Sequence, residues 1–484
     1  MRYMSYMGIK SSLPLHLRGK SSLAPFLTFL FNPSMPYARI ILLALVSLAF
    51  TVHTRAADPK TTATTLLTAA TNSTNAYARL AYLCDTFGPR FSGSTNLEHA
   101  IDWILAEMKR DGLSNVRGEP VAIPRWVRGQ ESLEMLAPRR QSLPMLGLGG
   151  SIATPRDGLT GKIFVVRSFD ELARRKAEAA GRIVVFNVPY EDYHKTVAVR
   201  TRGAIEAGRA GAIASLVRSI TPVSLQTPHT GNMGYDDAVP KIPHAAITIE
   251  DAELLQRLQD RGESPVLRLK MEATTLPDGL SRNVVAEIPG TEKPDEIVLV
   301  SGHIDSWDIG QGAQDDGGGC IAAWESARLI LKSGLKPRRT IRVVLWTNEE
   351  NGVRGAKSYV AQHTNALGKH VAAIESDSGI YQPTGFGLTG SEKAMTVLKS
   401  IAPLLEPVGA TQMEFGCRGT DVLQLLVGGV PAMHLEVDRK PYFNYHHTAA
   451  DTVDKVLPKD LNDCTAALAI MVWSLANSVE PLPR

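Results

Sequence analysis

Residues 340–352 read TIRVVLWTNEENG, a run of β-branched and apolar side chains followed by two adjacent glutamates. The apolar run is short and ends in polar turn residues, so it predicts a buried β-strand. Glu349 and Glu350 follow the strand end, where like charges repel each other and gain nothing obvious from packing. Adjacent residues at an irregular strand end need not point the same way. One carboxylate can therefore bind a metal ion while its neighbour faces a water molecule.

The flanking sequence, from about residue 282 to the end, repeats this pattern of strands. Apolar runs at 283–288, 296–302, 371–375 and 430–436 alternate with helical segments such as 320–334. Strands that alternate with helices predict an α/β fold with a largely parallel, helix-covered sheet. Ligands of such sheets bind in the crevice beyond the carboxyl ends of the strands. The residues that directly follow each strand are therefore the candidate site.

Three of these strands are followed by metal-binding types of side chain. His303 and Asp305 follow one strand, Glu349 and Glu350 a second, and Asp377 a third. A single charged residue after a strand is usually a solvated loop residue. Three such groups at equivalent strand ends favour one shared site.

Two further segments extend this set. Asp315 and Asp316 lie in the glycine-rich stretch 310–319, and His446 and His447 precede the last predicted helix. The alternative interpretations are a flexible turn with a helix cap and a surface loop. Imidazole and carboxylate ligands suit zinc or a similar divalent ion. The number of carboxylates predicts two ions, which a bridging carboxylate can hold ~3.5–4 Å apart.

The middle of the chain, from about residue 122 to 270, predicts a separate inserted unit. Short β-rich runs alternate there with glycine-rich helical pieces, and prolines and glycines punctuate it throughout. Its histidines, His194, His229 and His244, have no ligand-like spacing, so a structural role is favoured. Both ends of the unit must return to the catalytic body. We therefore expect it to cap the crevice.

The first 56 residues predict a secretory signal peptide. Arg39 precedes an apolar core at 40–52, and small residues follow around a cleavage site near Ala56. An uncleaved anchor is the alternative, but this core is short for a membrane span. The 34 residues before Met35 are long for a signal, so Met35 is an alternative start. We expect a secreted or periplasmic protein with no stable membrane span after cleavage.

Composition excludes one class of function. A net charge of +3 over 484 residues, with no basic run interleaved with aromatics, argues against nucleic-acid binding. The four cysteines, Cys84, Cys320, Cys417 and Cys464, match neither a zinc knuckle nor a dense disulfide framework. Buried free thiols are favoured, and one or two bridges are the alternative.

Five stretches together resemble the M28 zinc exopeptidases. They are FGPRFSGS (87–94), SGHIDSWDIGQGAQDDGGG (301–319), WTNEENGVRGA (346–356), ESDSG (375–379) and HHTAADT (446–452). The resemblance implies a mixed, largely parallel eight-stranded sheet flanked by helices, with a protease-associated-like β-rich α/β insert. It divides the chain into a peptidase domain at 57–121 and 282–484 and an insert at 122–281. It also implies two Zn²⁺ per chain, a homodimer, and aminopeptidase or dipeptidase action on short peptides with free termini.

The resemblance further implies a role for each candidate residue. Glu349 would be the general base, Asp305 would lie behind His303 and orient the site, and Asp316 would stabilise its loop. The metal ligands would be His303, Asp315 as the bridge, Glu350, Asp377 and His447. The choice of His447 over His446 rests on the family spacing between this histidine and Asp451.

Two other functions fit the same architecture. One is a catalytically inactive, receptor-like binding protein, and the other is an enzyme of the glutaminyl cyclase type. All five ligands and the base are present, which favours a peptidase over a binding protein. Asp315 together with the Glu349–Glu350 pair favours two metals, whereas the cyclase relatives typically hold one zinc.

Overall fold

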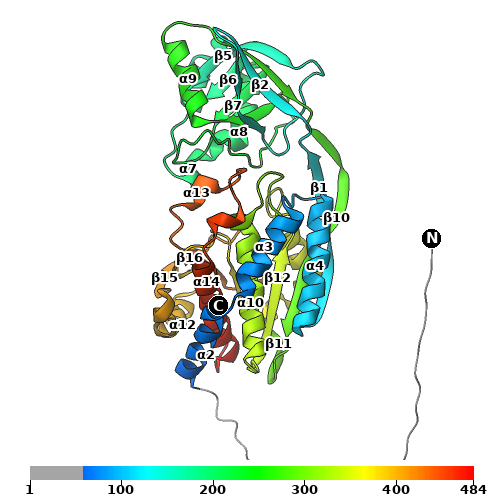
Figure 1. Ribbon diagram of the computed structural model, residues 1–484, viewed down its shortest axis with the longest axis vertical. Coiled ribbons are helices and arrows are strands. Elements are labelled where there is room, and N and C mark those ends of the chain that lie inside the picture. Colours follow the sequence, from blue (N-terminus) through cyan, green and yellow to red (C-terminus); the bar gives the residue numbers. More distant parts are fainter. Residues whose placement is uncertain (1–57) are drawn as a thin grey trace, which may run out of the picture. The chain divides into compact units, whose positions relative to one another are not determined.

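The computed structural model describes residues 58–484, which form two eight-stranded mixed sheets with flanking helices (Figure 1). The predicted signal peptide at 1–56 lies outside the described residues. Among residues 58–484, no helix combines the length and apolar character needed to cross a membrane.

The first sheet has the strand order β1-β10-β12-β11-β13-β16-β14-β15. Its four central strands, β12, β11, β13 and β16, are parallel, and β10, β1 and β14 add antiparallel pairs. The predicted mixed, largely parallel eight-stranded sheet is thus confirmed. The strand bounds are β1 Ser114–Val127, β10 Thr274–Ile288, β12 Arg339–Trp346, β11 Lys293–His303, β13 His370–Glu375, β16 Ala432–Val437, β14 Pro383–Thr389 and β15 Gln412–Phe415.

Helices cover both faces of this sheet because its strands are apolar on both sides. Val298 and Val300 of β11 pack into one core with α2, α3, α4, α10, α12 and α14, while Leu299 packs into another with α11 and short 3₁₀ turns. This alternation is the period-two signature of a strand buried on both faces. The helices are α2 Pro59–Thr71, α3 Asn75–Phe87, α4 Thr95–Asp111, α10 Gly318–Lys332, α11 Arg354–Gln362, α12 Glu392–Ile401, α13 Tyr442–Tyr445 and α14 Pro458–Asn477. The 3₁₀ turns are η2 Thr364–Lys369, η3 Ala402–Val408, η4 Val422–Gly428 and η5 Val453–Lys455, and η1 Ala313–Gly317 is a short π-helical turn.

Helix α4 illustrates how local sequence sets these bounds. The Ser94 hydroxyl accepts a hydrogen bond from Leu97 N at 3.2 Å and caps the first turn. Gly112 ends the helix in the left-handed region, with φ of +91°. Between these caps Leu97, Ile101 and Ile104 share the buried face, as their spacing predicts.

The second sheet contains only strands from residues 131–271 and has the order β3-β2-β9-β5-β6-β7-β8-β4. Its strands are β2 Glu131–Ala137, β3 Gln141–Leu143, β4 Met145–Gly147, β5 Leu159–Val166, β6 Ile183–Phe186, β7 Ala214–Arg218, β8 His244–Ile247 and β9 Val266–Met271. Its helices are α5 Phe169–Arg174, α6 Lys176–Ala179, α7 Tyr193–Thr196, α8 Ala198–Arg209 and α9 Ile249–Asp260.

Two long strands of the first sheet lead into and out of this second sheet. Strands β1 and β10 pair antiparallel from Ser114 opposite Glu287 to Val127 opposite Thr274. The domain boundaries predicted at 121/122 and 281/282 fall inside this pair and stay predictions. We refer to residues 131–271 as the insert.

The four cysteines are all unpaired. Cys84, Cys320 and Cys464 are buried, and burial raises the pKa of the Cys84 thiol to about 12. Cys417 is only partly buried. The favoured interpretation of free thiols agrees with this structure, except that one thiol is less buried than expected.

Candidate active site

The candidate site lies at the carboxyl ends of three neighbouring parallel strands. Strand β11 lies between β12 and β13, with His303 opposite Trp346 and Ser301 opposite Glu375. The chain that leaves β12 carries Glu349 and Glu350, and the chain that leaves β13 carries Asp377. Parallel pairing therefore brings these side chains to one edge of the sheet, as the sequence predicted.

Two histidines and three carboxylates form the centre of the site. His303 Nε2 lies 3.3 Å from Asp315 Oδ1 and 3.5 Å from Asp377 Oδ1. His447 Nε2 lies 3.3 Å from Asp315 Oδ2 and 3.0 Å from Glu350 Oε2. Asp315 thus lies between the histidines and directs one oxygen toward each. The structure brings together all five residues that were predicted as metal ligands.

The donor set of this cluster fits a divalent cation. Asp315 Oδ2 and Glu350 Oε1 are buried and accept no hydrogen bond from residues 58–484. A buried carboxylate oxygen without a partner is costly, and a cation removes that cost. Imidazole nitrogen and carboxylate oxygen are ligands that zinc commonly takes. The residues present therefore fit a zinc site.

The pKa shifts in the cluster show that its carboxylates favour positive charge on their neighbours. Burial alone would lower the pKa of His303, but Asp315 and Asp377 raise it well above its usual range. Glu350 and Asp315 likewise raise the pKa of His447 well above its usual range, although burial alone would lower it. Although burial opposes it, the two histidines hold the pKa of Asp315 well below its usual range. Such a cluster stabilises a cation placed among its carboxylates.

The two adjacent glutamates point to different partners. Glu350 contacts His447, whereas Glu349 is half-buried, lines a cavity and accepts no side-chain hydrogen bond within residues 58–484. Burial raises the pKa of Glu349 well above its usual value, with His303 opposing. A carboxylate with a raised pKa and no protein partner is free to accept a proton. The two adjacent carboxylates therefore have different surroundings.

Asp305 fixes the backbone of both glutamates. Its Oδ1 accepts the Glu349 N–H at 3.0 Å, and its Oδ2 accepts the Glu350 N–H at 3.3 Å. Its backbone carbonyl lies 2.9 Å from His303 Nδ1, which leaves Nε2 directed at the carboxylates. The sequence placed Asp305 behind His303. In the structure its carboxylate hydrogen-bonds chiefly to the glutamate turn, and its main-chain oxygen orients the histidine.

Two other aspartates shape the loop that carries Asp315. Asp316 accepts the His303 N–H at 3.0 Å through Oδ2 and the Gly319 N–H at 3.2 Å through Oδ1. Asp451 accepts three successive backbone N–H groups of residues 313–315, at 3.1, 2.7 and 3.1 Å. Burial raises the pKa of Asp451 to about 7. These bonds fix the position of Asp315 through its main chain.

Sequence reasoning missed one residue that supports the same loops. Arg90 is fully buried, and its guanidinium donates to the carbonyl oxygens of Ile304, Gln311 and Gly312 at 2.9, 2.6 and 2.9 Å. It thereby ties the turn after β11 to the loop before Asp315. The available signal was a lone arginine in the stretch FGPRFSGS, which carries no ligand-like pattern.

Known peptidases share the fold of this chain and are similar to it in sequence. A family model described as peptidase family M28 matches residues 283–472. Carboxypeptidase Q of Homo sapiens is 49% identical over 408 residues, which cover 84% of this chain and 86% of that protein. The chain belongs to peptidase family M28. A peptidase M28 precursor from Shewanella amazonensis SB2B is 36% identical with a TM-score of 0.85, covering 88% of this chain and 98% of that one.

An aminopeptidase from Aneurinibacillus sp. strain AM-1 has the same fold, with a TM-score of 0.64 at 21% identity, over 87% of this chain and 97% of its own. The family identifies this chain as a metallo-exopeptidase that acts on peptides. The alternative of an inactive binding protein is therefore set aside.

The insert of this M28 peptidase contacts the candidate ligand His447 directly. Thr230 N donates to the His447 carbonyl at 3.0 Å, and His447 Nδ1 lies 3.2 Å from the Thr230 carbonyl oxygen. His447 has a φ of +60°, an unusual conformation for histidine that these contacts help to hold. Arg128, which precedes the insert, adds a second link, because its Nη2 donates to Thr230 Oγ1 at 3.3 Å and lies 2.6 Å from Asp308 Oδ1. The insert thus helps to position a residue of the site.

His446 lies beside His447, and their rings stack with centroids 3.5 Å apart. Its Nε2 lies 3.7 Å from Asp315 Oδ2, so both histidines approach the same carboxylate. Only His447 of the pair also contacts Glu350 among the described residues. Burial and the neighbouring His447 lower the pKa of His446 well below its usual value. The assignment of His447 as the ligand stays a prediction.

A cavity of about 230 Å³ opens onto the site of this M28 peptidase. Its walls combine residues of the catalytic sheet edge, the insert and the segment around α13. The lining includes Asp315, Glu349, Glu350, Asp377, His447, Tyr193, His194, Arg200, Arg418, Arg439, Tyr442 and Phe443. The candidate catalytic groups therefore face a polar space that is partly open to solvent.

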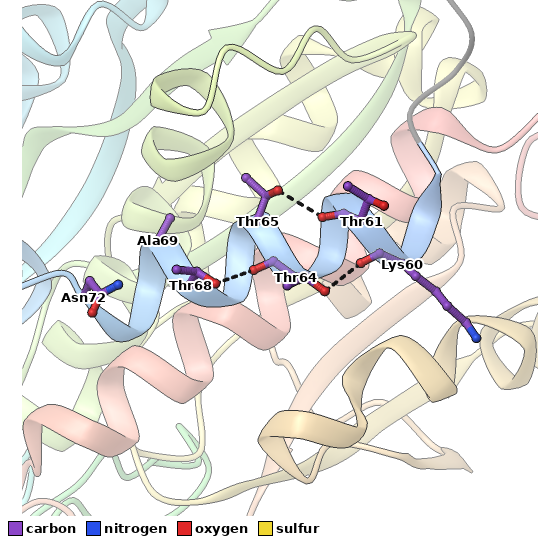
Figure 2. A pocket seen from close by; sticks show the side chains of 7 residues that line it. All are labelled: Lys60, Thr61, Thr64, Thr65, Thr68, Ala69 and Asn72. Atoms are coloured by element: carbon purple, nitrogen blue, oxygen red, sulfur yellow. Dashed lines mark hydrogen bonds between the residues drawn. The ribbon is translucent and has the colours of Figure 1, made fainter.

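A larger hollow of about 660 Å³ lies along α2 and has a different character (Figure 2). Its threonines donate to their own helix, for example Thr64 Oγ1 to the Lys60 carbonyl at 2.9 Å and Thr68 Oγ1 to the Thr64 carbonyl at 2.8 Å. Lys60 is its one charged lining residue. Among residues 58–484, no carboxylate or imidazole lines this hollow, so the described walls offer neither a base nor metal ligands.

Proposed function

We propose that this M28 peptidase is a di-zinc exopeptidase that hydrolyses short peptides with free termini, with Glu349 as the general base. The observation that carries this proposal is the position of Asp315 between His303 and His447. Glu350 and Asp377 complete the two ends of the cluster.

The contacts divide the ligands between the two ions. His303 and Asp377 would hold one Zn²⁺, and His447 and Glu350 would hold the other. Asp315, with one oxygen toward each histidine, would bridge them. When bound, Zn²⁺ supplies a Lewis acid that polarises the scissile carbonyl and acidifies the attacking water.

Glu349 then carries the proton. Its carboxylate faces the cavity without a protein partner, so it can accept a proton from the attacking water and deliver it to the leaving amine. Asp305 holds the Glu349 main chain in place, which keeps the carboxylate at the reacting atoms.

The shape of the cavity supports short substrates. Its volume of about 230 Å³ is below the ~300–1,000 Å³ of ordinary ligand pockets. Tyr193, His194 and Arg200 of the insert line it together with Glu349, which supports a capping role for the insert. In such a space the charged end of a peptide must meet a counter-charge or hydrogen-bond partners.

The proposal also includes the location and the oligomeric state of the protein. We expect it to be secreted or periplasmic after cleavage of the signal peptide, and to form a homodimer.

A substrate panel tests the proposed specificity. The zinc-loaded enzyme should hydrolyse a dipeptide best, fail on its N-acetylated form and leave casein intact, because a small cavity lined by the insert leaves little room for an internal segment of a long chain. Product release is followed by amine detection and mass spectrometry. Internal cleavage of casein would contradict the proposal, since it requires a cleft open at both ends.

Metal content tests the number of ions. Elemental analysis of the untreated protein should give about two divalent ions per chain, as expected where one carboxylate serves two metals. A chelator should remove activity, and added Zn²⁺ should restore it. A reproducible stoichiometry near one in fully active protein would contradict the two-ion assignment and the bridging role of Asp315.

A further inference from the structure

One guanidinium in the wall of the active-site cavity has no protein partner. Arg439 lines the same cavity as Glu349 and Asp377 and is half-buried. Within residues 58–484 its side chain forms no hydrogen bond or ion pair. The adjacent Asp438 lies 3.7 Å from Lys440 instead.

The other two arginines of the cavity are already engaged. Arg418 forms an ion pair with Glu436. Arg200 donates to the Tyr193 hydroxyl at 2.8 Å and to the Thr230 carbonyl at 3.4 Å. Among the described residues, Arg439 is therefore the one cavity arginine with no side-chain N–H donor engaged, whereas Arg200 leaves only its Nε without a partner.

The surroundings of Arg439 favour the binding of an anion. Burial lowers its pKa, and the nearby cation of Arg418 lowers it further. The nearby carboxylate of Glu436 opposes these effects only in part, and it is already paired with Arg418. An anionic ligand would supply the missing partner, and a planar guanidinium matches a carboxylate with two parallel hydrogen bonds.

The fold places this cation at the same edge of the sheet as the catalytic cluster. Strand β16 is the parallel neighbour of β13 and ends at Val437, two residues before Arg439. The carboxylates follow β11, β12 and β13, and the free cation follows the next strand. A short peptide in this cavity can thus present its scissile bond to the carboxylate cluster and an anionic end to Arg439.

We propose that Arg439 binds a carboxylate on the residue after the scissile bond and so selects substrates with an anionic C-terminal residue. This inference rests on the proposed peptidase function. The carboxylate has two sources, the free C-terminus of a dipeptide or an acidic side chain. The guanidinium of Arg439 can pair with either carboxylate in the same way.

Arg439→Gln tests the assignment with three substrates: alanyl-alanine, its C-terminal amide, and alanyl-glutamate α-amide. For wild type, kcat/KM should be higher with a carboxylate than with the plain amide. The variant should lose about 10–100-fold on a carboxylate substrate, mainly through KM, as for a lost hydrogen bond to a charged group. The plain amide should change least, and Arg439→Lys should recover part of the loss.

Lys440→Gln is the matched control, because it removes the same charge from the next residue, whose side chain is 88% exposed. It should match wild type on all substrates. Melting temperatures should agree between wild type and Arg439→Gln, since no side-chain hydrogen bond or ion pair within residues 58–484 is lost. A loss confined to alanyl-alanine assigns the free C-terminus, and one confined to the glutamate amide assigns the side chain. An equal loss on all three substrates, or none, overturns the proposal.

Calorimetric binding of alanyl-alanine separates this proposal from the peptidase proposal. Weaker binding to Arg439→Gln than to wild type supports the carboxylate contact even if wild type cleaves none of the substrates, a result that would reject the peptidase proposal alone. Equal binding to both proteins overturns the role of Arg439.

Discussion

Replacement of Glu349 by glutamine should slow dipeptide hydrolysis by ~10²–10⁴-fold while zinc content stays unchanged. The amide keeps the size of the side chain but cannot accept the proton of the attacking water. Because Glu349 makes no side-chain hydrogen bond in the described structure, its replacement breaks no contact that supports the fold. The loss should appear in kcat more than in KM, as for an interaction made in the transition state. Steady-state kinetics and elemental analysis of the same preparation measure both quantities.

The adjacent residue provides the control for this prediction. Glu350→Gln makes the same chemical change one residue later, but Glu350 Oε2 lies 3.0 Å from His447 Nε2 in the predicted ligand cluster. This variant should lose metal as well as activity. Near-normal turnover of zinc-loaded Glu349→Gln would mean that the base lies elsewhere. Loss of metal from Glu349→Gln with retention by Glu350→Gln would reverse the two roles.

The parallel strands and the residues at their ends could be predicted because both signals are local. Strand β12 is a continuous apolar run, and Glu349 and Glu350 follow it directly. The rule that ligands bind beyond the carboxyl ends of parallel strands then places these residues beside His303 and Asp377. This rule requires only the order and direction of the strands and no side-chain contact. The regular α/β pattern was therefore enough to predict which residues lie together at this edge of the sheet.

Strands β14 and β15 are among the strands that escaped prediction, because their sequences are atypical. Strand β14 carries Pro383, Gly385 and Gly387, which weaken a strand pattern. Gly385 packs so closely against β15 that an added Cβ would lie 1.8 Å from the Gln412 carbonyl oxygen. The close approach of the two backbones thus explains why β14 has a glycine at position 385, although glycine is disfavoured in strands. Strand β15 is short and mostly exposed, so it has no apolar alternation.

Long-range backbone contacts were also beyond the reach of sequence reasoning. The Thr230 carbonyl contacts His447 across 217 residues, and Arg90 reaches the carbonyls of two separate loops. Main-chain groups are present at every residue, so no side-chain pattern marks these partners. The insert was predicted to cap the site, but its hydrogen bonds to His447 depend on the fold of residues far apart in sequence.

Replacement of Asp315 by asparagine should reduce dipeptide hydrolysis by about 10³-fold or more, since several kcal/mol of charge stabilisation depend on the metals. Asp315 Oδ1 lies 3.3 Å from His303 Nε2, and Oδ2 lies 3.3 Å from His447 Nε2. An amide offers one acceptor oxygen and no negative charge, so it cannot bridge two ions. Elemental analysis of Asp315→Asn should therefore give fewer than two ions per chain.

Asp316→Asn is the sharpest control, because it makes the same change in the next residue of the same loop. Asp316 accepts the backbone N–H groups of His303 and Gly319, and burial raises its pKa well above its usual value. Its amide variant should keep both ions and lose about 1–3 kcal/mol of stability from an imperfectly replaced hydrogen bond. The competing assignment has a structural basis, because ligand atoms of His303, Asp316 and Asp377 lie within 4.8 Å of one another. If Asp316→Asn loses metal while Asp315→Asn retains both ions, Asp316 is the ligand and Asp315 supports the loop.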